Sequence, residues 1–199
     1  MDVEQKVWGI DFGSKLAGTT VVAYAVGGQL HFKTSAKKQD ADEMIRQLAW
    51  EHRPALIGID APLSLPGVYT AKPGFDDHFY RLCDKETKAM SPMFLGGLTA
   101  RAMKLAGILQ AHGTELIEVY PVYTGTELGL KAYGYRSKTP DLGKITDALT
   151  AHSGLSLGAD SYKLTGHHID AWLALITTRN YQQGKAQQAG AAAEGLIYY

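Results

Sequence analysis

The stretch Val7-Trp-Gly-Ile-Asp11 decides the fold, because a short apolar run ends there in a carboxylate. A second stretch, Leu56-Ile-Gly-Ile-Asp60, has the same Gly-Ile-Asp ending. Short apolar runs bounded by glycine or proline are typical of buried strands. An unpaired charge away from water is costly, so each aspartate needs a compensating partner at its strand end. The two stretches therefore predict two equivalent strand ends, each carrying a carboxylate.

The segments around these stretches predict an α/β arrangement. Residues 19–26 are rich in β-branched residues, Gly27-Gly28 marks a hairpin, and residues 29–34 alternate apolar and polar residues, so the chain opens as an antiparallel three-strand meander. Residues 40–52 have helical apolar spacing. A helix between two strands favours a right-handed crossover, which makes residues 56–59 parallel to a meander strand. If that neighbour is the first strand, Asp11 and Asp60 emerge at the same edge.

The rest of the chain completes a single domain, residues 1–199, with a central mixed sheet and helices on both faces. Residues 62–97 form an irregular insertion, rich in proline and glycine, with a short helix near residues 77–87. Helices are predicted at residues 98–110, 142–151 and 169–181, and a strand at residues 116–119. Residues 184–193 are expected to be a mobile connection or a frayed helix, and residues 196–199 an edge strand.

Composition narrows the class of protein. The chain has 199 residues, 45% of them hydrophobic and 20% charged, as in soluble globular proteins. Its formal net charge is zero, from 20 basic and 20 acidic residues, so any affinity for nucleic acid must come from a local patch. Cys83 is the only cysteine, which excludes an internal disulfide and a cysteine zinc site. With no signal-peptide pattern and no long apolar run, the expected location is the cytoplasm, away from membranes.

Six motifs spread over nearly the whole chain carry a family resemblance. They are Trp8-Gly-Ile-Asp-Phe-Gly13, Ile57-Gly-Ile-Asp-Ala-Pro-Leu-Ser-Leu-Pro66, Arg81-Leu-Cys-Asp84, Ile117-Glu-Val-Tyr-Pro121, His168-Ile-Asp-Ala-Trp172 and Glu194-Gly-Leu-Ile197. In this order and spacing the chain resembles a domain-of-unknown-function family of predicted RNase H-like nucleases, related to Holliday-junction resolvases. The resemblance implies an RNase H-like fold with acidic metal ligands.

Four acidic residues are candidate metal ligands and catalytic residues: Asp11, Asp60, Glu118 and Asp170. Clustered carboxylates either take up a proton or hold a cation, and hard oxygen ligands favour Mg²⁺ or Mn²⁺. The fold would support two-metal hydrolysis, in which Asp11 bridges both cations, Asp60 or Glu118 holds one, and Asp170 completes the set. His167, one helical turn before Asp170, would shuttle a proton or contact phosphate.

Each of these residues also has a purely structural interpretation. Asp11 and Asp60 would be turn residues that accept local hydrogen bonds. Asp170 would be a first-turn acid that favours the helix dipole. Glu118 would be an exposed strand residue paired with a nearby base, and His167 a helix-capping or surface residue.

Basic and aromatic residues are the candidate substrate contacts. Residues 131–138, a predicted loop, combine both types, and nucleobases would stack on its tyrosines. The alternative is a solvated loop whose tyrosines lie back on the domain. The backbone amides of residues 12–15 would bind a phosphate, and Arg81 would either position substrate or pin its loop through an ion pair with Asp84. The candidate set is Lys15, Arg81, Arg101, Lys131, Tyr133, Tyr135, Arg136 and Lys138.

These patterns favour a metal-dependent nuclease that recognises the backbone shape of DNA or RNA. Two other classes stay open. The first is a non-catalytic binding module that keeps the RNase H-like fold. The second is an actin-like or sugar-kinase-like ATP-binding phosphotransferase, because Gly9-Ile-Asp-Phe-Gly13 also resembles the phosphate loop of that superfamily. Such enzymes normally need two RNase H-like halves, for which 199 residues leave no room.

Overall fold

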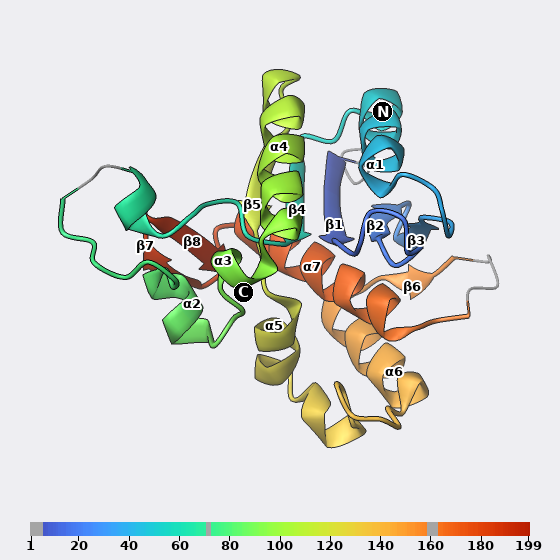
Figure 1. Ribbon diagram of the computed structural model, residues 1–199. Coiled ribbons are helices and arrows are strands. Elements are labelled where there is room, and N and C mark those ends of the chain that lie inside the picture. The colour runs from blue at the N-terminus through green and yellow to red at the C-terminus, as the bar shows by residue number, and fades with distance from the viewer. Residues whose placement is uncertain (1–5, 71–72, 159–162) are drawn as a thin grey trace.

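A six-stranded mixed sheet forms the centre of the computed structural model, which describes residues 6–70, 73–158 and 163–199 (Figure 1). Its spatial order is β5-β4-β1-β2-β3-β6, and only β2 runs antiparallel to the others. The strands are β1 (Val7–Asp11), β2 (Val21–Val26), β3 (Gln29–Thr34), β4 (Leu56–Asp60), β5 (Glu115–Glu118) and β6 (Ser156–Leu157). A meander followed by parallel strands on the side of β1 is the RNase H-like arrangement, so the predicted fold class is confirmed.

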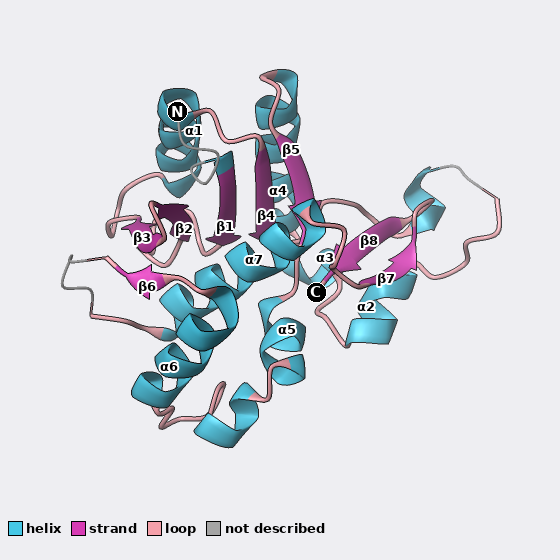
Figure 2. Cartoon of the chain, turned by 180° about the vertical axis from the view of Figure 1, so that it is seen from behind, coloured by secondary structure: helices cyan, strands magenta, loops and turns pink. Residues whose placement is uncertain are grey.

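Helices cover both faces of this sheet, as predicted (Figures 1 and 2). On one face α1 (Ala41–His52) and α4 (Gly97–Ala111) enclose an apolar cluster built around Trp8 and Ile10. On the other face α7 (Gly166–Gln182) crosses the sheet, with α6 (Leu142–Ser153) in the same cluster and α5 (Pro121–Glu127) alongside. In the part of the chain that the structure describes, no helix has both the length and the apolar character to cross a membrane.

The repeated Gly-Ile-Asp ending determines how closely α7 approaches the sheet. A Cβ atom on Gly9 would lie 2.0 Å from the backbone nitrogen of Leu175, and one on Gly58 would lie 1.9 Å from Oγ1 of Thr178. Both distances are far below van der Waals contact, so only glycine fits. Because successive side chains of a strand point to opposite faces, the isoleucine that follows packs toward α1 and α4.

The same alternation turns both strand-end aspartates toward the α7 face. In the parallel pairing of β1 with β4, Asp11 lies directly opposite Asp60. The meander strand parallel to β4 is thus the first one, which is the condition under which the two carboxylates share an edge. The register follows from the two glycines, since Gly9 also lies opposite Gly58 and both face one helix.

The insertion at residues 62–97 is more ordered than its composition indicates. It contains a 3-10 turn (Gly67–Thr70), α2 (Leu82–Thr87) and α3 (Pro92–Leu95). The predicted helix at residues 77–87 begins only at Leu82. Its first residues instead form a turn, because the Asp77 carboxylate accepts hydrogen bonds from the backbone amides of Phe79 and Tyr80, at 2.7 and 2.8 Å.

The expectation of a mobile connection or frayed helix at residues 184–193 is wrong. Strand β7 (Gln188–Ala191) forms an antiparallel hairpin with β8 (Gly195–Tyr198), which includes most of the predicted edge strand. The small and polar residues of this hairpin give no strand pattern in the sequence. Tertiary hydrogen bonds order it instead, since Gly190 donates its amide to Glu86 at 2.6 Å. Tyr198 also forms a parallel bridge with Val119, so the hairpin continues from the β5 end of the sheet.

Substituting Gly9 with alanine tests the close approach of α7. Its Cβ would collide with helix backbone, so we expect Gly9→Ala to lower the free energy of unfolding by about 3 kcal/mol. Gly107→Ala, in the middle of α4, is the matched control, because no atom lies within 4 Å of its Cβ position. It should raise stability by about 0.5–1 kcal/mol through helix propensity. Urea denaturation measures both; equal effects would contradict this packing.

Candidate active site

Three carboxylates from three elements lie near the ends of β1 and β4, close enough for the charges of two of them to act on the third. Asp11 and Asp60 come from the strands, and Asp170 comes from the start of α7. On the helix, Asp170 shares a face with Ala174 and Thr178, four and eight residues later, and this is the face that lies on the strand glycines. The charges of Asp11 and Asp170 both act on Asp60 and raise its pKa.

Asp60 is the carboxylate of this group for which the described residues provide no hydrogen-bond or ion-pair partner. It lines a cavity of about 480 Å³ together with Glu118, Tyr120 and Arg136. Burial raises the pKa of Asp60 well above its ordinary value, and the nearby carboxylates raise it further. A cation or a proton would stabilise this position.

Asp170 is buried but well bonded. Its Oδ1 accepts a hydrogen bond of 2.6 Å from the Tyr135 hydroxyl, and its Oδ2 lies 3.0 Å from the Arg136 guanidinium. Burial nevertheless raises the pKa of Asp170 to about 6, in spite of the opposing effect of Arg136. The Tyr135 ring is itself buried in the α7 cluster, so it holds the carboxylate and is not presented for stacking with nucleobases.

Asp11 is paired with His167, which lies one helical turn before Asp170 on α7. The His167 Nδ1 atom lies 2.7 Å from Asp11 Oδ2, and this hydrogen bond raises the pKa of the imidazole. The His167 side chain is half-exposed, and its Nδ1 is the ring nitrogen that Asp11 engages. Its neighbour His168 is buried and bonds to Thr165 at the start of the helix, which is a capping role.

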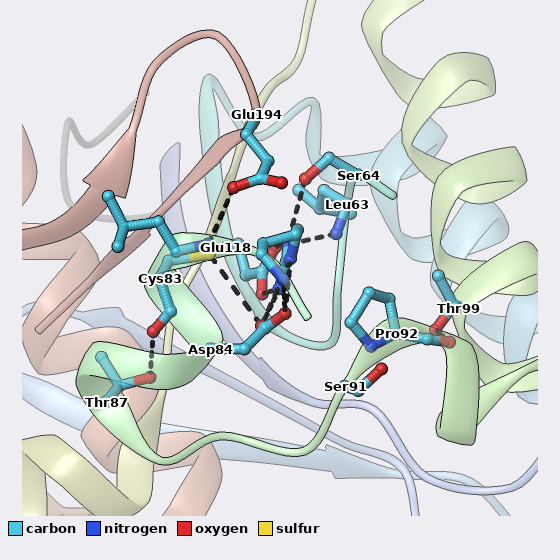
Figure 3. Close-up of polar contacts among 12 residues, drawn as sticks. Leu63, Ser64, Cys83, Asp84, Thr87, Ser91, Pro92, Thr99, Glu118 and Glu194 are labelled. Atoms are coloured by element: carbon cyan, nitrogen blue, oxygen red, sulfur yellow. Dashed lines mark hydrogen bonds and ion pairs between the residues drawn. The ribbon is translucent and has the colours of Figure 1, made fainter. Parts of the chain in front are cut away.

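Glu118 is engaged in a different set of contacts. Its carboxylate accepts hydrogen bonds from Arg81 at 2.6 and 2.7 Å and from the Leu63 amide at 2.9 Å. The same guanidinium binds Asp84 at 2.6 Å, and Figure 3 shows both carboxylates turned toward this centre. Glu118 is therefore paired with a base, but it is buried and not exposed. Its carboxylate is therefore occupied by protein donors.

The Arg81 contacts join segments that are distant in sequence. Arg81 also donates to Ser64 at 2.8 Å. Glu194, in the C-terminal hairpin and labelled in Figure 3, accepts hydrogen bonds from the amides of Gly67 and Leu82 at 2.8 and 2.7 Å. Arg81 has no exposed surface with which to contact substrate. The i, i+3 spacing of Arg81 and Asp84 is a sequence pattern that indicates an ion pair. No comparable pattern in the sequence indicates the contacts of Glu194.

Of the remaining substrate candidates, Arg136 contacts the carboxylate group through Asp170. Arg101 binds Asp42 at 2.6 Å, and Lys15 binds Asp40 at 2.9 Å, beside a separate small cavity. Residues 130–133 form a 3-10 turn within the predicted loop. Lys131, Tyr133 and Lys138 are exposed there, while Arg136 is half-exposed and reaches the Asp60 cavity.

The carboxylates of Asp11, Asp60 and Asp170 are of the type that binds a divalent cation, but they do not lie close enough together to coordinate one in this structure. Across residues 6–70, 73–158 and 163–199, no three His, Cys, Asp or Glu side chains are gathered closely enough to hold a metal ion. Asp11 is turned toward His167, and Asp170 toward Tyr135 and Arg136. The chemistry still fits, because oxygen ligands that repel one another are those that Mg²⁺ and Mn²⁺ compensate.

Comparisons with known proteins agree with the family resemblance. Residues 9–98 match the family described as "Protein of unknown function (DUF429)", which confirms the predicted resemblance to a domain-of-unknown-function family. A solved structure titled "Thermus thermophilus RuvC structure" is similar to the chain, with 15% sequence identity and a TM-score of 0.47. The similarity covers 92% of this chain and 98% of that one. No curated protein matches the chain.

Neutralising Asp60 should stabilise the metal-free protein. Because the pKa of Asp60 is raised on folding, the folded state loses stability as the pH rises above the ordinary value of 3.8. We expect Asp60→Asn to raise the free energy of unfolding by about 1–3 kcal/mol near pH 8, and by much less near pH 4, where the wild-type carboxyl is protonated. Asp147→Asn, an exposed carboxylate on α6, is the control for urea denaturation in EDTA. A stability gain that does not depend on pH would argue against this electrostatic cost.

Removing the Arg81 guanidinium should be severely destabilising. Arg81→Met leaves the carboxylates of Asp84 and Glu118 buried without their cation, which typically costs about 3–5 kcal/mol. Arg46→Met breaks the partly exposed pair with Glu43 and should cost under about 1 kcal/mol. Thermal and urea unfolding of both variants provide the comparison. Similar losses would mean that the Arg81 contacts do not hold the insertion in place.

Proposed function

We propose that this protein is a metal-dependent nuclease that hydrolyses phosphodiester bonds at the carboxylates of Asp11, Asp60 and Asp170. The observation that carries the proposal is the alignment of Asp11 with Asp60 across parallel strands, on the face where α7 brings Asp170. Such a group is costly to a fold that has no use for it, because each charge opposes the others. A catalytic site is the simplest reason for its presence.

Asp11, Asp60 and Asp170 would hold Mg²⁺ or Mn²⁺. When bound, the cations supply an activated water and stabilise the leaving oxygen of the phosphodiester. Glu118 would remain with Arg81 and keep the end of β5 in place, since its contacts are satisfied inside the protein.

The side chains around the carboxylates would bind the phosphate and handle protons. Arg136 is half-exposed and lines the Asp60 cavity, so its guanidinium can donate to phosphate oxygens while it shields Asp170. The raised pKa of His167 keeps more of its imidazole protonated near neutral pH. That cation would contact phosphate or transfer a proton through the ring nitrogen that does not face Asp11.

Nucleic acid is the substrate class that we propose. The chain has zero net charge, so contacts to the phosphate backbone must come from a few exposed cations. We propose Arg136, which lines the Asp60 cavity, and the exposed Lys131 and Lys138 from the same loop. Lys15 and Arg101 are bonded to acidic partners and would contribute only after exchanging them. We expect recognition of the backbone, with a modest dependence on salt.

A non-catalytic binding module is the second candidate, and one observation favours it. The carboxylates of Asp11 and Asp170 already accept hydrogen bonds from His167 and Tyr135, so the fold neutralises part of its charge without a cation. In that case the site would bind a ligand or a structural metal and turn nothing over.

Metal titration followed by a cleavage assay tests the proposal. We expect Mn²⁺ and Mg²⁺ to bind the wild type in calorimetry, and Asp11→Asn or Asp170→Asn to weaken binding. Metal-dependent cleavage of oligonucleotides should fall more than about a hundredfold in either variant, because each removes a ligand. Asp147→Asn should leave both properties unchanged.

Glu118→Gln separates the two possible sets of ligands. If Asp60 is the second ligand, Asp60→Asn should abolish metal binding, whereas Glu118→Gln should retain it in protein shown by circular dichroism to be folded. Metal binding without cleavage of any oligonucleotide would favour the binding module. The absence of metal binding in the wild type at millimolar concentrations would count against the nuclease.

A further inference from the structure

The insertion presents a group of exposed aromatic rings beside the site. Phe79 and Phe94 are 55% and 61% exposed, and their rings stack with centroids 5.8 Å apart and planes 21° apart. Tyr80 meets the edge of Phe94 at 5.7 Å. We call Phe79, Tyr80 and Phe94 the aromatic platform. Large apolar side chains that stay in water as a contiguous group mark interaction sites more often than scattered ones do.

Hydrogen bonds from the backbone hold the platform in this form. The Asp77 carboxylate fixes the amides of Phe79 and Tyr80, and it is itself held by Lys85 at 2.7 Å. The buried Ser91 hydroxyl donates to the Phe79 carbonyl and accepts from the Met93 amide, which ties the turn at Phe79 to the start of α3, the helix that carries Phe94 (Figure 3 shows Ser91 there). These hydrogen bonds fix the backbone of the segments that carry the rings.

The platform borders the proposed catalytic cavity through the segment that leads into α3. Met90, four residues before Phe94 and 60% exposed, lines the same cavity as Asp60 and Arg136. Leu95, next to Phe94, lines it as well. The segment that carries Phe94 therefore also contributes side chains to the Asp60 cavity.

We propose that the aromatic platform binds an unpaired nucleobase of the substrate strand while the adjoining phosphate occupies the carboxylate site. This inference rests on the proposed function and names its substrate class, a nucleic acid with a single-stranded segment. Every base has a π-face that stacks on phenyl and phenol rings, whatever the sequence. Bases of an intact duplex are already stacked on each other, so they are not available to the platform.

The position of the platform favours this occupant over a protein partner or a second copy of the chain. A protein interface of ordinary strength needs a patch much wider than three rings and a polar rim of its own. Here Leu95, the neighbour of Phe94 on α3, lines a cavity that holds a guanidinium and a carboxylate, Arg136 and Asp60. Stacked rings next to a phosphate-binding cation match the alternation of base and phosphate along one strand.

Binding of oligonucleotides by the full chain in EDTA tests the platform without cleavage. The probe is a short single-stranded oligodeoxynucleotide with one aminopurine, whose fluorescence reports stacking, and its blunt duplex is the comparison. We expect tighter binding of the single strand, a stacking signal, and about a tenfold loss of affinity in Phe94→Ala. Phe94→Leu should lose the stacking signal while it keeps an apolar side chain, and Phe94→Tyr should restore it.

Trp50→Ala is the matched control, since Trp50 is 45% exposed on α1 and does not line the Asp60 cavity. Equal affinities of wild type and Phe94→Ala, or no binding of the single strand by the wild type, would overturn the platform. So would a change from dimer to monomer in Phe94→Ala by sedimentation without any effect on oligonucleotide binding. Mn²⁺ titration of Phe94→Ala separates the two proposals, because loss of the platform should leave metal binding intact.

Discussion

The close approach of α7 to β1 and β4 is the constraint on which the rest of the structure depends. Gly9 and Gly58 leave no room for a Cβ atom, so the helix backbone lies directly on the two strands. Two residues further along each strand, the alternation of side chains turns Asp11 and Asp60 to the same face. The Gly-Ile-Asp ending of each strand thus has two effects: its glycine allows α7 to pack closely, and its aspartate places a carboxylate on the same face.

This arrangement concentrates charge in a place where the fold offers only partial compensation. His167 and Arg136 each oppose one carboxylate, and Tyr135 adds a neutral hydrogen bond, while Asp60 retains a strongly raised pKa. By contrast, Glu118 accepts two hydrogen bonds from Arg81 in a network that ties the insertion to the C-terminal hairpin, although burial still raises the pKa of its carboxyl. The two acidic groups at neighbouring strand ends therefore differ: Glu118 is bonded within the protein, whereas Asp60 belongs to the group that we propose as the cation site.

The sequence predicted the parts of the structure that local patterns encode. Apolar runs, turn residues and helical spacing were sufficient for the meander, the crossover and the common edge of Asp11 and Asp60. Patterns did not reveal the β7–β8 hairpin, because its small and polar residues acquire order through distant partners such as Glu194. The burial of Arg81 and Tyr135 could not be predicted either. A basic or phenolic side chain is expected at the surface unless its carboxylate partner is known, and these partners are distant in sequence, Asp170 for Tyr135 and Glu118 for Arg81.

If β1, β4 and α7 together form one cation site, as we propose, a crystal grown or soaked with Mn²⁺ should show the metal between them. Anomalous scattering locates the metal without any assumption about activity. We predict density between the carboxylates of Asp11, Asp60 and Asp170, with Asp170 released from Tyr135 or Arg136 and with Glu118 still bound to Arg81. Density at Glu118 with Arg81 displaced, or no density near Asp11 in crystals saturated with the metal, would contradict the account.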